Sequence, residues 1–281
     1  MADAPSPGSL PTLDDLRREI DRIDAGMHEF LMERGRIIDT LIQVKKTQAS
    51  GSAFRPGREA SQMRVLAGRH KGTLPFDTVE SIWRIIVSTF TYVQAPYAVH
   101  ADISGGDAPM RDTCRFHFGF TVPYMPHDSA KAVIDAVAHS AGDLGVFRAE
   151  PGRAAGAWWT ALAGPDRPKI IARLPFVERP QHPAGMPVYC ISKPIEDAAV
   201  RDIVLYALGV ERWREGLQPA LARMGASVES SAGDDSGLNL LVAAPGSVTL
   251  DALMAAMAGL GVGVFDIREI GSHAARFRLP A

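Results

Sequence analysis

A long heptad pattern of apolar residues near its start most constrains what this chain can fold into. Its apolar residues lie three or four positions apart, with one step of seven between Phe30 and Ile37: Leu13, Leu16, Ile20, Ile23, Met27, Phe30, Ile37, Leu41 and Val44. Such spacing is typical of one face of an amphipathic α-helix. Thr12 followed by Asp15 is a capping-box pattern, and Gly51 favours a helix end. We therefore predict one helix from about residue 12 to about residue 48.

Two shorter helices complete the predicted N-terminal domain. One begins after Pro56 and runs to about Gly72, and the other begins after Pro75 and runs to about Tyr97. We predict a disordered N-terminus at residues 1–11 and a helical domain at residues 12–100. The first helix extends about 54 Å, too far for two short helices to cover its apolar stripe. The uncovered part predicts a partner, most simply a second copy of the chain.

The rest of the chain has α/β character. Residues 101–112 contain Gly, Asp and Pro and are predicted to form a linker before an α/β region at residues 113–198. The expected elements of that region are strand 115–122, helix 129–140, strand 144–148, a helix around Trp158, and strands 170–174 and 188–192. Residues 199–281 follow a βαββαβ order, which is typical of ferredoxin-like domains. The predicted fold class is multidomain, α plus α/β.

The composition excludes several classes of function. The chain is 46% hydrophobic and 22% charged with a formal net charge of -2, so its overall charge attracts neither nucleic acid nor an anionic membrane. It lacks a signal-peptide pattern and any run of about 18 apolar residues, which predicts a cytoplasmic protein. Cys114 and Cys190 lack the spacing of a metal or disulfide site. Any anionic ligand must be held by a local cluster.

Arg34 occupies a core position of the heptad pattern. A buried guanidinium must be paired, so Arg34 either meets a carboxylate such as Asp24 or Glu59, or binds an anionic ligand. Arg17 and Lys45 lie one position off the same stripe, near its two ends. They are either solvated flanks or further cations for the same ligand.

Gln94 ends the apolar face of the third predicted helix. The residues that precede it on that face are Trp83, Val87 and Phe90. Its amide therefore points inward, where it either bonds to the backbone or donates to a ligand. Arg58 and Glu59 form a charge pair in the first turn of the second helix.

These residues together make segment 13–97 resemble the all-helical class of chorismate mutases. The resemblance is carried by the run 16–24, by Glu33 and Arg34, by Lys45, by the run 54–59 and by Gln94. It implies an intertwined homodimer that rearranges chorismate to prephenate, a step of the shikimate pathway toward phenylalanine and tyrosine.

The resemblance also implies a role for each site residue. Arg34 and the partner subunit's Arg17 are expected to clamp the two substrate carboxylates. Lys45 and Gln94 are expected to donate to the ether oxygen. Glu59 is expected to accept from the ring hydroxyl, with Arg58 supporting the wall. The reaction is pericyclic, so neither a nucleophile, a metal nor a redox cofactor is expected; the protein must orient a dianion and stabilise charge on the breaking bond.

Two positions depart from the family pattern. The family commonly has a small hydroxyl residue one turn before the glutamine, where this chain has Phe90. Thr89 or Thr91 would have to substitute, or that carboxylate contact is absent. Some members also carry an Asp where this chain has Arg55.

The C-terminal two-thirds faintly resembles a shortened prephenate dehydratase followed by a small ligand-sensing (ACT-like) domain. The resemblance is carried by residues 136–146, 158–162, 169–171 and 260–272. The dehydratase Thr-Arg-Phe signature has no match, because the aligned residues 186–189 are Met-Pro-Val-Tyr. Of the dehydratase Glu-Asn-Ser/Thr motif only Glu150 remains. We expect a remnant without dehydratase activity, which could strengthen the dimer or bind phenylalanine or tyrosine.

Two other functions stay open. The chain could be a non-catalytic regulator that binds chorismate or aromatic amino acids, which Phe90 favours. It could also be an isochorismate pyruvate lyase, since that reaction uses the same anion clamp.

Overall fold

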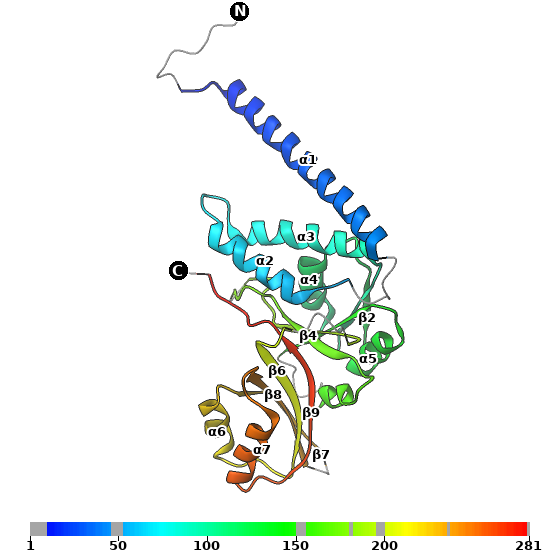
Figure 1. Ribbon diagram of the computed structural model, residues 1–281, viewed down its shortest axis with the longest axis vertical. Coiled ribbons are helices and arrows are strands. Elements are labelled where there is room, and N and C mark those ends of the chain that lie inside the picture. Colours follow the sequence, from blue (N-terminus) through cyan, green and yellow to red (C-terminus); the bar gives the residue numbers. More distant parts are fainter. Residues whose placement is uncertain are drawn as a thin grey trace, which may run out of the picture. The chain divides into compact units, whose positions relative to one another are not determined.

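The computed structural model describes residues 10–45, 53–149, 156–179, 182–194, 200–234 and 237–279 (Figure 1). The chain divides into two compact units, Met1–Ala49 and Ser50–Ala281, and each is described by itself. Most of the predicted N-terminal segment 1–11 lies outside the described residues, as does Gly51.

The first unit contains one helix, α1 (Leu13–Lys45), as the heptad pattern predicts. The capping box is confirmed: the backbone N–H of Thr12 donates to Asp15 Oδ2 at 3.0 Å, and that of Asp15 donates to Thr12 Oγ1 at 3.2 Å. Hydrogen bonds from Thr12 lower the pKa of Asp15. The large apolar side chains exposed along α1 include Leu13, Leu16, Ile20, Ile23, Met27, Phe30, Ile37 and Val44.

The next two helices, α2 (Pro56–Arg69) and α3 (Phe76–Gln94), belong to the second unit. Pro56 suits the first position of α2, where its missing N–H has no partner to lose. The core that contains both helices also contains residues of the following α/β region: Phe54, Met63, Leu66, Phe76 and Val79 pack with Met110, Phe118, Val146, Leu174 and Phe176. The compact units thus divide after Ala49, whereas the sequence predicts a boundary at residues 101–112.

The predicted linker and the first predicted strand of the α/β region are wrong. Residues 99–118 instead form β1 (Val99–Asp102) and α4 (Asp107–Phe118), and β2 (Tyr124–His127) follows. Phe116, Phe118 and Phe120 alternate through the predicted strand 115–122, as residues on one face of a strand do. The structure instead has a helix, in which Met110, Cys114 and Phe118 face the core at a spacing of four residues. Phe120 is 83% exposed, and the Arg115 guanidinium lies over its ring.

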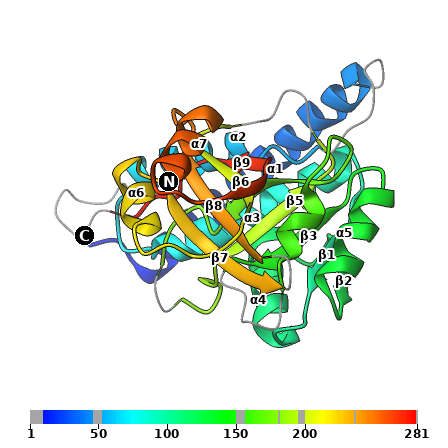
Figure 2. The same ribbon diagram turned by 90° about the horizontal axis from the view of Figure 1, so that it is seen from below.

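The remaining elements of this region follow the prediction. They are α5 (Ala130–His139), β3 (Leu144–Arg148), the short 3-10 helix η2 (Trp158–Leu162), β4 (Lys169–Leu174) and β5 (Val188–Ser192). Strands β2, β1 and β3 are parallel, and β5 joins β3 and β4 in antiparallel pairs. α4 and α5 flank the parallel strands (Figure 2).

The C-terminal part has the predicted βαββαβ order. Its elements are β6 (Ile203–Val210), α6 (Leu217–Arg223), β7 (Ser227–Asp234), β8 (Gly237–Pro245), α7 (Leu250–Gly259) and β9 (Val264–His273). α6 and α7 share a core with these strands.

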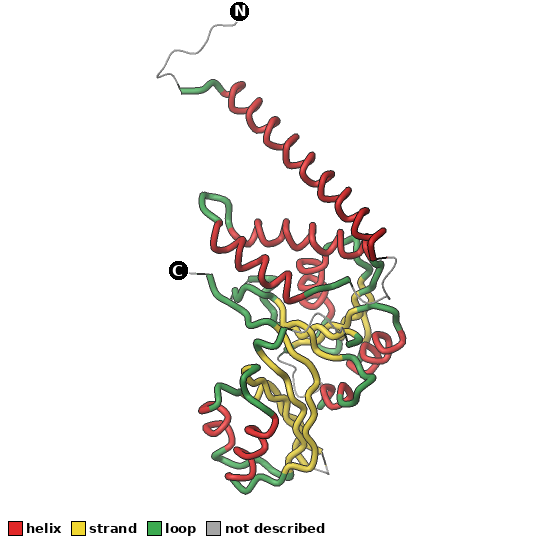
Figure 3. The backbone as a smooth tube through the Cα atoms, in the orientation of Figure 1, coloured by secondary structure: helices red, strands yellow, loops and turns green. Residues whose placement is uncertain are grey.

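One nine-stranded sheet runs through the second unit, in the order β2-β1-β3-β5-β4-β9-β6-β8-β7. Helices lie on both sides of its strands (Figure 3). The two halves meet where Ile170 of β4 pairs with Gly271 of β9. Gly271 has φ +145°, and a Cβ there would lie 2.1 Å from the Ile170 carbonyl oxygen. This junction therefore requires glycine.

Candidate active site

Three of the expected site residues lie on α1. Arg17 is exposed and its Nη1 pairs with Asp14 Oδ1 at 3.1 Å. Exposed pairs of this kind contribute little stability. Arg34 is half-buried. Lys45 is the last residue of α1, and its side chain lies outside the described part of the structure.

The helical rise separates these residues. Arg17 and Arg34 lie about 26 Å apart along the axis of one uninterrupted helix. Lys45 lies about 17 Å beyond Arg34, so two long side chains can reach toward a ligand from those positions. A single α1 cannot bring both Arg17 and Arg34 to one small ring-shaped anion.

The other expected residues lie on α2 and α3. Arg58 is exposed in the first turn of α2. Gln94 is the half-buried last residue of α3, and its Nε2 donates to the Phe90 carbonyl at 3.0 Å. The backbone-bonded alternative for this amide is therefore observed. Nε2 carries two N–H groups, so this bond does not by itself prevent donation to a ligand.

Glu59 is buried and already paired. Its Oε2 accepts from Nη1 of Arg84 on α3, and the two side chains are 5% and 1% exposed. The Nη2 of Arg84 donates to the His117 carbonyl on α4 at 3.0 Å. Arg84 of α3 thus pairs with Glu59, and the His117 carbonyl of α4 accepts a second hydrogen bond from the same guanidinium.

The sequence interpretation missed Arg84. On α3 the buried polar residues are Glu80, Arg84, Ser88 and Thr91. Polar residues at this helical spacing usually face solvent, but here they lie in the core that α3 shares with α4. Glu80 pairs with Arg179, and burial raises the pKa of Glu80. Only the tertiary structure reveals that this polar face is covered.

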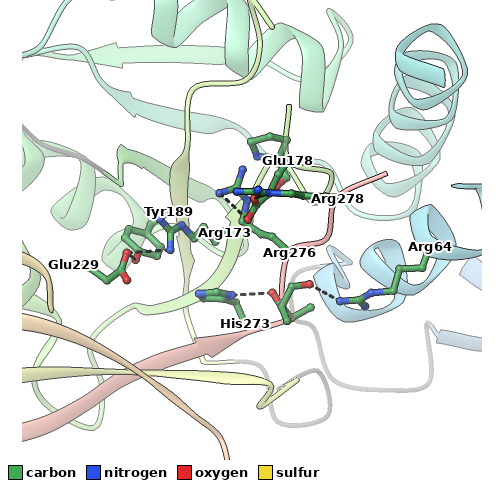
Figure 4. Close-up of polar contacts among 11 residues, drawn as sticks. Arg64, Arg173, Glu178, Tyr189, Glu229, His273, Arg276 and Arg278 are labelled. Carbon is green, nitrogen blue, oxygen red and sulfur yellow. Dashed lines mark hydrogen bonds and ion pairs between the residues drawn. The ribbon is translucent and has the colours of Figure 1, made fainter. Parts of the chain in front are cut away.

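A second polar cluster lies where β4, β5, β7 and the C-terminal segment meet (Figure 4). Arg173 pairs with Glu229 at 2.9 Å, and the Tyr189 hydroxyl donates to the same carboxylate at 3.4 Å. Arg276 and Arg278 both pair with Glu178, at 3.7 and 2.8 Å. The Arg64 Nη2 on α2 donates to the Ala275 carbonyl. These contacts join the βαββαβ part to β4 and to α2.

Burial sets the protonation of this cluster. It lowers the pKa of His273 to about 4 and raises that of Tyr189. It also lowers the pKa of Arg276, helped by the neighbouring Arg173 and Arg278 cations. Tyr189, in the strand aligned with the dehydratase signature, has a structural partner, whereas Glu150 lies outside the described residues.

Within the described ranges, no group of three or more His, Cys, Asp and Glu side chains is arranged to hold a metal ion. Across the same residues, no helix has the length and apolar character needed to cross a membrane.

Comparison with known proteins identifies the N-terminal segment. The family model for chorismate mutase type II matches residues 16–95. A bifunctional chorismate mutase/prephenate dehydratase of Pseudomonas aeruginosa is 30% identical over 139 residues, which cover 48% of this chain and 38% of the relative. A protein of the same name from Neisseria gonorrhoeae is 32% identical over 92 residues, covering 31% and 25%. The matches thus span less than half of either relative.

A solved structure, described as GqqA, a novel type of quorum quenching acylase, aligns with 64% of this chain and 95% of its own. The TM-score is 0.43 at 16% sequence identity, which does not establish a shared fold. The family match confirms the recognition made from the sequence: residues 16–95 match the model of the chorismate mutase type II family, and a mixed α/β region follows them.

Proposed function

We propose that this protein is a chorismate mutase that converts chorismate to prephenate in the cytoplasm. The observation that carries the proposal is the family match over residues 16–95, which contains Arg17, Arg34, Arg58, Glu59 and Gln94. The reaction breaks a C–O bond and forms a C–C bond within one molecule. It needs a folded substrate conformer and donors at the developing negative charge, and neither a nucleophile nor a metal.

The proposed roles follow the charges of the side chains. Arg34 and the partner subunit's Arg17 hold the two carboxylates, because a guanidinium binds a carboxylate with two parallel hydrogen bonds. Lys45 and Gln94 donate to the ether oxygen. Glu59 accepts from the ring hydroxyl, and Arg58 supports the wall beside it.

The helical rise supports a homodimer. One α1 spaces Arg17 and Arg34 by about 26 Å, so both can hold one substrate only if they come from different copies. The apolar stripe of α1, exposed from Leu13 to Val44, gives a second α1 a surface to bury.

For the C-terminal region we propose an ACT-like ferredoxin fold that binds phenylalanine or tyrosine, following a dehydratase remnant without activity. The βαββαβ order and the antiparallel strand order β9-β6-β8-β7 support this fold. The structural engagement of Tyr189 with Glu229 supports the loss of dehydratase chemistry.

The test is chorismate turnover by the wild-type chain and by Arg34→Ala, followed as loss of chorismate absorbance. We expect kcat/KM to fall by about 100-fold or more, because a charged donor is lost from a site that excludes water. Arg36→Ala, which removes an exposed arginine two positions away, is the matched control. Equal activity in Arg34→Ala would end the proposal.

Product analysis separates the alternatives. Prephenate supports the mutase, and pyruvate from isochorismate would indicate the lyase. Thermal stabilisation by chorismate without turnover would indicate a non-catalytic regulator, which Phe90 favours.

A further inference from the structure

We propose that Arg84 is a positioning residue for Glu59, and that the α/β region is thereby a working part of the mutase site. This inference rests on the proposed mutase function and on the role proposed there for Glu59. It assigns a function to a residue of α3 that the sequence interpretation did not select.

The geometry fixes Glu59 through one guanidinium. Arg84 donates from Nη1 to Glu59 Oε2 and from Nη2 to the His117 carbonyl at 3.0 Å. Its guanidinium carbon lies 5.5 Å from the centre of the Phe176 ring. Because the guanidinium is planar, α4 and the segment after β4 fix its plane and so the direction of its bond to Glu59.

The charge of Glu59 depends on the same contact. A carboxylate as buried as this one is strongly disfavoured without a cation. Removing Arg84 therefore favours the protonated acid, which is a weaker acceptor for a substrate hydroxyl. Arg84 thus both orients Glu59 and balances its charge.

The titratable groups near this pair are Tyr97, Cys190, His117 and Glu80. Tyr97 and Cys190 interact with Glu59, and burial raises the pKa of each. Burial and nearby Arg84 lower the pKa of His117 well below its usual value. These three groups stay neutral across the neutral pH range. Glu80 lies one turn from Arg84 and pairs with Arg179, so its own titration needs a control.

The test is the pH dependence of chorismate turnover by the full-length chain carrying Arg84→Met. We expect kcat/KM to fall about tenfold per pH unit below a new inflection and to recover above it. The wild type and Arg179→Met should lack this inflection; the latter loses a buried ion pair of the same helix that does not touch Glu59. Arg84→Lys, which restores a cation, should move the profile back toward the wild type.

A folded Arg84→Met protein with wild-type kcat, KM and pH profile would overturn the inference. If Arg84→Met does not fold, the Glu59→Gln/Arg84→Met pair, which has no charge at either position, replaces it. Its kcat/KM should then equal that of Glu59→Gln alone, and a further loss would overturn the inference. A wild-type chain that never consumes chorismate would refute the proposed function itself. An active wild type with a flat Arg84→Met profile would refute only the role of Arg84.

Discussion

His273 is the last residue of β9 and 2% exposed, with its Nδ1 bonded to the Ala274 carbonyl at 2.8 Å. Burial lowers its pKa from 6.5 to about 4. The unfolded chain, with the ring in water, therefore binds a proton at a higher pH than the folded chain does. His273 thereby contributes a pH dependence to the free energy of unfolding.

We predict that the free energy of unfolding is lost progressively as the pH falls from 6.5 toward 4, by about 3 kcal/mol from His273. His273→Asn keeps a donor for the carbonyl and does not titrate, so its unfolding free energy should decline less over this window. Urea unfolding at pH 7 and pH 5 measures the difference. His139→Asn, at an exposed histidine, controls for the loss of an imidazole. An unchanged decline in His273→Asn would contradict the prediction.

Among the elements, α1 differs from every other helix because its apolar stripe is exposed. Phe30 is 72% exposed and Leu13 is equally so. α2 and α3, in contrast, bury their apolar residues in the core of the second unit. The proposed partner of the stripe is the same stripe of a second copy.

We predict that Phe30→Asp prevents dimer formation. Each buried Phe contributes about 1.5–3 kcal/mol, and twofold symmetry places the change in both copies. Light scattering after gel filtration should show a dimer for the wild type and a monomer for the variant. Mutase activity should fall with the dimer, because Arg17 then cannot reach the partner's substrate. Ala25→Asp adds the same charge on the opposite side of α1 and should remain dimeric.

At the scale of the whole molecule, the family segment 16–95 is not a structural unit. Its two short helices share a core with β1, β3, β4 and α4. The buried pair of Glu80 with Arg179, the bond from Arg84 to the His117 carbonyl and the bond from Arg64 to the Ala275 carbonyl cross the end of this segment. α2 and α3 thus depend on residues far along the chain.

We predict that a chain ending at Ala98 does not fold, although it contains the complete family segment. Phe54, Met63, Leu66 and Phe76 would lose partners. At about 1.5–3 kcal/mol each, this loss is comparable with the whole stability of a typical domain. Near-ultraviolet circular dichroism and a chorismate assay, run beside the intact chain, give the answer. A folded and active fragment would show that the helices are independent.

The sequence by itself determined the long helix, its capping box, nearly all elements after residue 129 and the family of residues 16–95. These depend on local spacing and on a motif, which a linear pattern carries. The prediction for residues 101–122 was wrong, because Phe116, Phe118 and Phe120 alternate as in a strand. In the structure α4 forms there instead and buries Met110, Cys114 and Phe118. The tertiary structure alone decided that the polar face of α3 is covered, that Arg84 pairs with Glu59, and that α2 and α3 pack into the α/β core. Burial depends on which distant segment covers a face, and spacing along one helix does not specify that segment.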